Sequence, residues 1–162
     1  MTGRSLLAVA GPMLVRLRDA TGEIIRFGVP GDAGQVQIVA SHPTHPPVGT
    51  LGKVAARVYL QAGSVPKAVL AFMPQRTPTA SSRRCPSCRG THPPPRWTRS
   101  TCATSLAASG RSADSIGDQD FEDGARGVGA PVFGPEGRPL AGLSVGGPAD
   151  RMDDAALERF VA

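Results

Sequence analysis

The chain opens with an amphipathic pattern over residues 5–20. Apolar residues recur there with the 3.6-residue period of a helix, and charged residues such as Arg16 and Asp19 fall on the opposite side. Pro12 lies within this stretch and predicts a kink, because proline lacks the N–H that a helix interior needs. Gly22 is expected to end the helix, since glycine readily adopts the left-handed conformation that follows a last turn. The predicted apolar face consists of Leu6, Val9, Ala10, Met13 and Leu17.

Short apolar runs and prolines organise the next part of the chain. A turn at residues 31–34 separates two predicted strands and indicates a hairpin. Residues 42–47 are rich in proline and predict a loop, because each proline removes a backbone hydrogen-bond donor. A further loop enters a helix within residues 61–74, with Pro66 near its first turn and Pro74 at its end. The predicted strands are residues 23–29, 35–39 and 54–60.

The pattern breaks down over residues 75–114, which have no periodic apolar face. This segment is rich in Arg, Pro and Ser and contains all three cysteines and the single tryptophan. Such a composition buries too little apolar surface to offset the entropy lost on ordering, so we expect the segment to be disordered. Order returns from residue 115 onwards. The pattern then predicts strands at 125–133 and 140–147, joined by a turn at 134–139, and a last helix at 153–162.

This order of elements predicts an α/β (α+β) fold, with an antiparallel sheet flanked by helices, in a single domain over residues 1–162. The net charge of +5 does not alter this predicted fold class, because the excess of basic residues lies in one segment. Residues 75–113 carry seven arginines and no acid, and the rest of the chain has 11 basic and 13 acidic residues. Any nucleic-acid contact that the positive charge predicts would therefore involve only that segment.

Targeting signals and cysteine content indicate a soluble, cytoplasmic protein. The apolar start lacks a convincing signal-peptide cleavage site, and no stretch approaches the roughly 20 apolar residues of a membrane span. Three cysteines, an odd number within residues 85–102, argue against a secreted disulfide framework. Cys85, Cys88, His92 and Cys102 could form a Cys3His zinc site within a basic nucleic-acid-binding arm at residues 76–111, which we keep as the alternative function. Three consecutive prolines between the last two ligands weigh against it.

Three sequence blocks resemble the effector-binding domain of the IclR family of bacterial transcriptional regulators. Residues 121–152 read FEDGARGVGAPVFGPEGRPLAGLSVGGPADRM and are similar to the C-terminal signature of that family. Residues 6–23, LLAVAGPMLVRLRDATGE, resemble the helix that opens the domain, and residues 59–74, YLQAGSVPKAVLAFMP, resemble its loop and helix. The blocks occur in the family's order and together cover residues 5–74 and 115–160.

The resemblance implies a GAF-like fold that senses an effector and mediates oligomerisation, with no catalysis and no cofactor. In the family a winged helix-turn-helix precedes this domain, and we expect this chain to lack it. DNA would then be reached only through a partner, either a homo-oligomer or an intact paralogue of the family.

The resemblance also implies where a small organic or aromatic acid would bind. The loop at 62–66 would supply backbone donors at Ser64 and Val65 for the effector's carboxylate, at a helix N-terminus suited to anions. Further positions come from the acidic run and the last strands. This chain has Pro66 and Gly146 where relatives usually have Gly and Ser, and Gly127 where they often have Cys. The implied effector-binding residues are Ala62, Ser64, Val65, Asp118, Asp120, Gly127, Ser144 and Gly146.

The composition of residues 76–114 suggests a hypothesis about the gene. Relatives have a segment of similar length here, but its residues differ in type. Arg, Pro, Ser, Cys and Ala are what GC-rich DNA yields when it is translated out of frame. We therefore predict two compensating frame changes, which would make the chain a truncated remnant. The coding DNA tests this, because the shifted frame should read as a strand and a helix rich in Leu, Glu and Asp.

Overall fold

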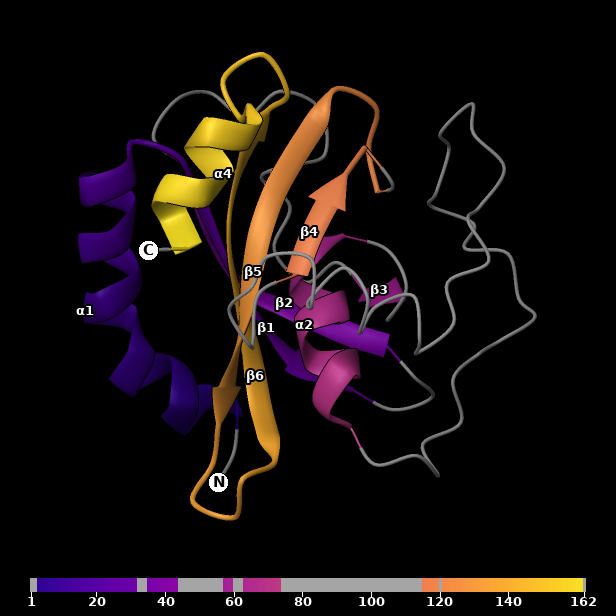
Figure 1. Cartoon of the computed structure of the whole chain (residues 1–162). Helices are drawn as coiled ribbons and strands as arrows, with labels where there is room; N and C mark the ends of the chain where they lie inside the picture. The colour runs from indigo at the N-terminus through magenta and orange to yellow at the C-terminus, as the bar shows by residue number, and fades with distance from the viewer. Residues whose placement is uncertain are drawn as a thin grey trace.

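The computed structural model describes residues 3–31, 35–43, 57–59, 63–73, 115–119 and 121–161. Within them lie three helices, α1 (Gly3–Thr21), α2 (Ser64–Phe72) and α4 (Asp154–Val161). The strands are β1 (Ile24–Pro30), β2 (Gln35–His42), β3 (Arg57–Tyr59), β4 (Ser115–Asp118), β5 (Ala125–Phe133) and β6 (Pro139–Pro148). They form one antiparallel sheet in the order β3-β2-β1-β6-β5-β4, which confirms the predicted α+β class (Figure 1). The segment 75–114 and the turn residues 32–34 lie outside the described residues.

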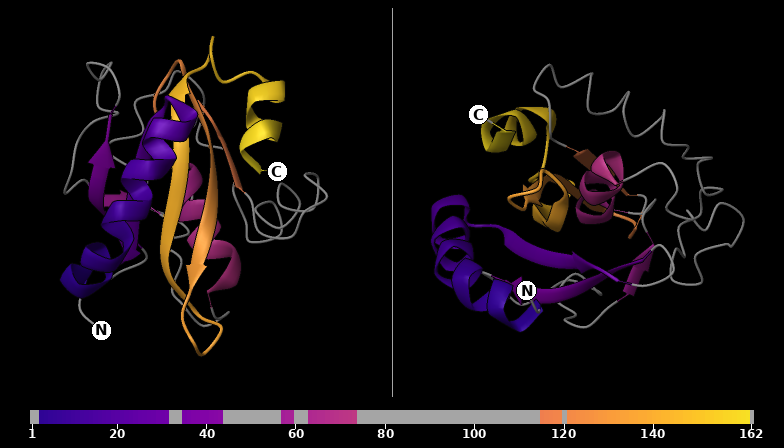
Figure 2. Two further views of the ribbon diagram at one scale, coloured as in Figure 1. Left: turned by 90° about the vertical axis from the view of Figure 1, so that its left-hand side faces the viewer. Right: turned by 90° about the horizontal axis from the view of Figure 1, so that it is seen from below.

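Helices cover both faces of the sheet (Figure 2). Helices α1 and α4 pack on one face and α2 packs on the other. Alternate residues of each strand point to opposite faces, so each face has its own apolar cluster. The α1/α4 face buries Ile25, Phe27, Val128, Ala141 and Val145, and the α2 face buries Val36, Ile38 and Val58.

The buried face of α1 differs from the predicted one at two positions. Leu14 is 2% exposed, but Val9 and Met13 are 73% and 59% exposed. The helix therefore contacts the sheet along a row that runs through Leu14, and this row is rotated by about 50° around the axis from the predicted face. Leu6, Leu7, Ala10 and Leu17 complete the buried row. The helix runs through Pro12 and ends at Thr21, and Gly22 follows it with a φ of 69°.

The predicted hairpin between the first two strands is confirmed. Strands β1 and β2 pair antiparallel, and a register shift follows Phe27. Strand β2 extends to His42, so His42 belongs to the sheet and not to the predicted loop at 42–47, of which residues 44–47 lie outside the described residues. The reason is its pairing with Ile25, which continues the ladder of β1. Strand β3 is confirmed at Arg57–Tyr59, and the other residues of the predicted strand at 54–60 lie outside the described residues.

Helix α2 approaches the sheet closely because glycines lie beneath its first turn. A Cβ on Gly129 would lie 2.7 Å from the backbone of Ser64, and one on Gly142 would lie 2.8 Å from the carbonyl oxygen of Val65. Real Cβ atoms essentially never approach so closely. The Ser115 hydroxyl donates to the Ser64 carbonyl oxygen at 2.6 Å, which joins the start of α2 to β4.

The chain closes with a hairpin and a capped helix. Strands β5 and β6 pair along their length, and Gly137 takes a φ of 70° in the turn between them. The Asp153 carboxylate accepts from the Ala156 N–H at 2.7 Å and so caps α4 at the position where a free N–H needs an acceptor. Among the described helices, none is long and apolar enough to cross a membrane.

Candidate functional site

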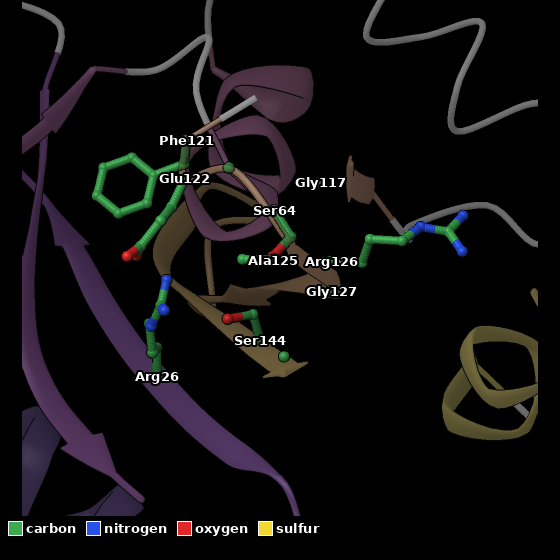
Figure 3. Close-up of a pocket in the computed structure, with 11 residues that line it drawn as sticks. Arg26, Ser64, Gly117, Phe121, Glu122, Ala125, Arg126, Gly127 and Ser144 are labelled. Atoms are coloured by element: carbon green, nitrogen blue, oxygen red, sulfur yellow. The ribbon is translucent and has the colours of Figure 1, made fainter. Parts of the chain in front are cut away.

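A small hollow lies on the α2 face of the sheet, where the first turn of α2 meets β1, β5 and β6 (Figure 3). The centre of a water molecule could move within ≈ 30 Å³ of it. Since one water needs roughly 10–15 Å³ of such space, the hollow has room for about two or three waters. Its lining residues are Arg26, Gly63, Ser64, Gly117, Phe121, Glu122, Ala125, Arg126, Gly127, Ser144 and Gly146.

The N-terminus of α2 forms one wall of the hollow. Gly63 precedes the helix with a φ of 79°, and no side chain caps the first turn. Pro66 has no N–H, and the Lys67 N–H reaches the Gly63 carbonyl oxygen at 3.4 Å. The first N–H groups of a helix carry partial positive charge and favour an anion.

Ser144 contributes a buried hydroxyl on the floor of the hollow. It lies on β6 opposite Arg26 of β1 and Gly129 of β5, so its side chain shares their face of the sheet. It is 4% exposed, and within the described ranges no group forms a hydrogen bond with its hydroxyl. Because Ser144 lines the hollow, a polar molecule that enters it can form a hydrogen bond with this hydroxyl.

Arg26 brings a buried positive charge to the same place. Burial lowers the pKa of the Arg26 guanidinium, and the nearby Glu122 carboxylate acts in the opposite direction. In Figure 3 the two side chains point toward one another. The guanidinium carbon also lies 5.9 Å from the centre of the Phe121 ring, within the range of a cation–π contact. Consecutive residues of one segment therefore contact Arg26 from the same side.

Arg126 borders the hollow, but its charge lies elsewhere. Figure 3 shows its side chain directed away from the other lining residues. Its guanidinium donates to the Met152 carbonyl oxygen at 2.9 Å and to the Asp154 carboxylate at 2.8 Å. The hydrogen bond to Asp154 is the main cause that raises the pKa of Arg126. Arg126 thus holds α4 against β5.

Four of the predicted effector-binding residues meet in the hollow, namely Ser64, Gly127, Ser144 and Gly146. Val65 is 2% exposed, with its side chain in the apolar core, and it borders an adjoining smaller hollow. Asp118 does not line the main hollow. Its carboxylate lies 3.3 Å from Arg126 Nε and its side chain is 55% exposed. Ala62 and Asp120 lie outside the described residues, and binding at all eight positions stays a prediction.

The sequence patterns did not identify Arg26, Phe121 and Glu122 as residues of the site. A signal for Arg26 was present, because it is the single charged residue within the apolar run of β1, at a position that faces the interior. The contact of Phe121 and Glu122 with it depends on how the segment before β5 folds back, which no local pattern encodes.

The alternative zinc ligands Cys85, Cys88, His92 and Cys102 lie outside the described residues. In the ranges that the structure describes, no group of three or more His, Cys, Asp or Glu side chains could hold a metal ion.

Comparisons with known proteins agree on one family. The family model described as bacterial transcriptional regulator IclR C-terminal matches residues 1–162. The structure is similar to that of IclR from Thermotoga maritima, with a TM-score of 0.77, 20% identity, and coverage of 96% of this chain and 62% of that one. This chain therefore spans less than two thirds of that protein. A search of curated proteins finds no significant match.

Two further solved structures show the same fold. An IclR homologue from Microbacterium hydrocarbonoxydans, complexed with 4-hydroxybenzoate, has a TM-score of 0.75 and 23% identity, and the match covers 98% of this chain and 64% of that one. The C-terminal domain of a putative transcriptional regulator from Vibrio cholerae has a TM-score of 0.67 and 18% identity, with coverage of 99% and 94%. The match of the family model over the whole chain and the shared fold together show that this chain belongs to the IclR family of bacterial transcriptional regulators, as its C-terminal domain.

Proposed function

We propose that this chain is an effector-binding regulatory domain that senses a small organic or aromatic acid. The observation that carries the proposal is the hollow itself, where the first turn of α2, the hydroxyl of Ser144 and the guanidinium of Arg26 surround one space. All three favour a group that is negatively charged and accepts hydrogen bonds. A carboxylate meets both requirements.

The size of the hollow implies that binding involves movement. Space for two or three waters admits a carboxylate group but not a whole aromatic acid. The neighbouring residues must therefore separate when an effector enters, and a change of conformation is what a sensor needs. The 4-hydroxybenzoate in the homologue's structure supports an aromatic acid as one candidate class.

We extend the proposal to the setting in which the domain works. The domain would act in the cytoplasm within an oligomer and would influence a DNA-binding partner or domain, with a regulatory and not a catalytic role. Membership of the family supports the regulatory role. The exposed apolar residues Val9 and Met13 on α1 support self-association. The zinc-binding nucleic-acid alternative gains no support from the family match.

The test is ligand-dependent thermal stabilisation of the purified chain. The panel comprises 4-hydroxybenzoate, benzoate, pyruvate and glyoxylate, each paired with its amide and with NaCl at equal ionic strength. An acid present at 100 times its Kd should stabilise the fold by about 2.7 kcal/mol, which raises the Tm by about 5–11 °C for a domain of this size. The amides should have little effect. The proposal is wrong if no acid raises the Tm above the NaCl control.

A further inference from the structure

The segment that precedes β5 presents to Arg26 the same two groups that an aromatic acid would present. Glu122 supplies a carboxylate and Phe121 supplies a ring, and the two residues are adjacent in the chain. Both line the hollow proposed for the effector. Resting on that proposed function, we propose that Phe121 and Glu122 are an internal mimic of an aromatic carboxylate, and that the effector displaces them from Arg26.

The charge of Arg26 explains why the mimic is needed. A buried guanidinium without a nearby negative charge would destabilise the fold strongly. In the structure the Glu122 side chain points toward Arg26 and meets this requirement, and its charge accordingly acts to raise the pKa of Arg26. The carboxylate of an effector would supply the same negative charge. Glu122 could then move into solvent, and the buried Arg26 guanidinium would still have a negative charge beside it.

Displacement of Phe121 and Glu122 would also affect helix α4, which lies outside the hollow. The turn after Glu122 is joined to the end of β6, because the Ala149 N–H donates to the Gly124 carbonyl oxygen at 2.7 Å. Two residues later Arg126 donates to Met152 and Asp154, at the start of α4. Movement of residues 121–124 therefore acts directly on the attachments of α4. The ligand class is thus an aromatic carboxylate, and α4 is the element that responds to its binding.

The first experiment measures the affinity of benzoate by calorimetry, with benzamide as the neutral probe. A mimic that occupies Arg26 about 90% of the time lowers the apparent affinity about tenfold. Glu122→Gln should therefore bind benzoate at least about tenfold more tightly than the wild-type chain, and benzamide should gain nothing. Arg26→Gln should lose benzoate binding. Glu136→Gln is the matched control, because Glu136 is exposed in the turn between β5 and β6.

The outcomes separate the two proposals. If Glu122→Gln binds benzoate no more tightly than the wild-type chain, or not at all, the internal mimic is wrong, even where another acid of the panel binds. If Glu122→Gln gains benzoate binding but no acid stabilises the wild-type chain, Glu122 occupies Arg26 but is not displaced, so both the displacement and the proposed effector class are wrong. Glu122→Asp, which keeps the charge on a shorter side chain, should give an intermediate Kd and serves if the Gln variant does not fold.

A second experiment reads the displacement directly. Saturating benzoate should speed hydrogen exchange at residues 121–124 of the wild-type chain, because these residues lose their contacts with Arg26. Simple occupation of the hollow without displacement would slow exchange there instead. Slower or unchanged exchange would therefore overturn the proposal.

Discussion

Single glycines decide how much space the hollow contains. A Cβ on Gly127 would lie 2.7 Å from the Val145 carbonyl oxygen, whereas one on Gly146 would lie 3.4 Å from its nearest neighbour, the Arg126 carbonyl oxygen. The first contact requires the strands to move apart and the second is ordinary van der Waals contact. The two glycines line the same hollow but differ in their tolerance of a side chain.

This difference gives the first prediction. Gly127→Ala should lower the free energy of unfolding by about 1–3 kcal/mol, as added groups in packed sites generally do. Gly146→Ala should change it by no more than about 0.5 kcal/mol. Urea unfolding of the two variants measures both values. Equal destabilisation would show that the spacing between β5 and β6 does not decide the tolerance.

The residue scale also shows how far a sequence can define a site. Four of the eight residues implied by family resemblance lie together around the hollow, because a motif fixes which strand and which helix end carry them. Asp118 does not, because its carboxylate lies beside Arg126, a partner that the motif does not specify. Arg26 was missed because its local signal, one charge within the apolar run of β1, does not show which distant residues it contacts.

At the scale of elements, the close packing of helix α2 on the sheet requires strand residues without side chains beneath its first turn. Gly129 lies on β5 beneath the first turn of the helix, and Ser64 would meet any side chain added there. Gly129→Ala should therefore displace α2 and cost about 1–3 kcal/mol. Gly11→Ala is the control, because no atom lies within 4 Å of an added Cβ and alanine favours a helix by about 1 kcal/mol over glycine. Thermal melts should shift in opposite directions, and a shift of both in the same direction would contradict the packing argument.

The attachment of α4 gives a second prediction at this scale. Arg126→Ala removes the donors to Met152 and Asp154. The loss of about 1–2 kcal/mol expected for hydrogen bonds of this kind should speed hydrogen exchange of the α4 amides by about 5- to 30-fold. Arg138→Ala, in the exposed turn, should leave that exchange unchanged. Equal protection of α4 in the two variants would mean that apolar packing alone holds the helix.

The elements themselves were more predictable than their contacts. The strands of both hairpins were recognisable because alternation and turn residues are local signals. The buried face of α1 was predicted less well, because Leu14 and Met13 are both apolar and only the position of the sheet decides which of them is buried. Tertiary contacts, which the periodic pattern does not contain, settled the choice.

At the scale of the whole molecule, one ion pair joins the residue before β1 to the residues that precede α4. Arg151, just before α4, donates to both carboxylate oxygens of Glu23, at the start of β1, and both distances are 3.0 Å. The Glu23 side chain is 11% exposed and that of Arg151 is 49% exposed. The hydrogen bond to Glu23 is the main cause that raises the pKa of Arg151.

The pH dependence of this pair follows from the direction of that shift. Because the pKa of Arg151 is raised on folding, its contribution to stability is fully present below the unfolded pKa and is lost only as the pH rises through the folded pKa. Both values lie above the range in which proteins are usually handled. We therefore expect the Arg151 contribution to stay constant between about pH 6 and 9, a range well below the arginine pKa.

A double-mutant cycle tests the pair as a link between the two ends of the fold. Arg151→Ala leaves a nearly buried carboxylate without its paired donors and should cost about 1–3 kcal/mol. Glu23→Gln should cost less, because the neutral amide is cheaper to bury and half of Arg151 remains in water. The double variant should lose less than the sum of the two, since each single change already breaks the same contact. Strict additivity in urea unfolding would show that the two residues stabilise the fold independently, and the N- and C-terminal parts would then be held together by the sheet alone.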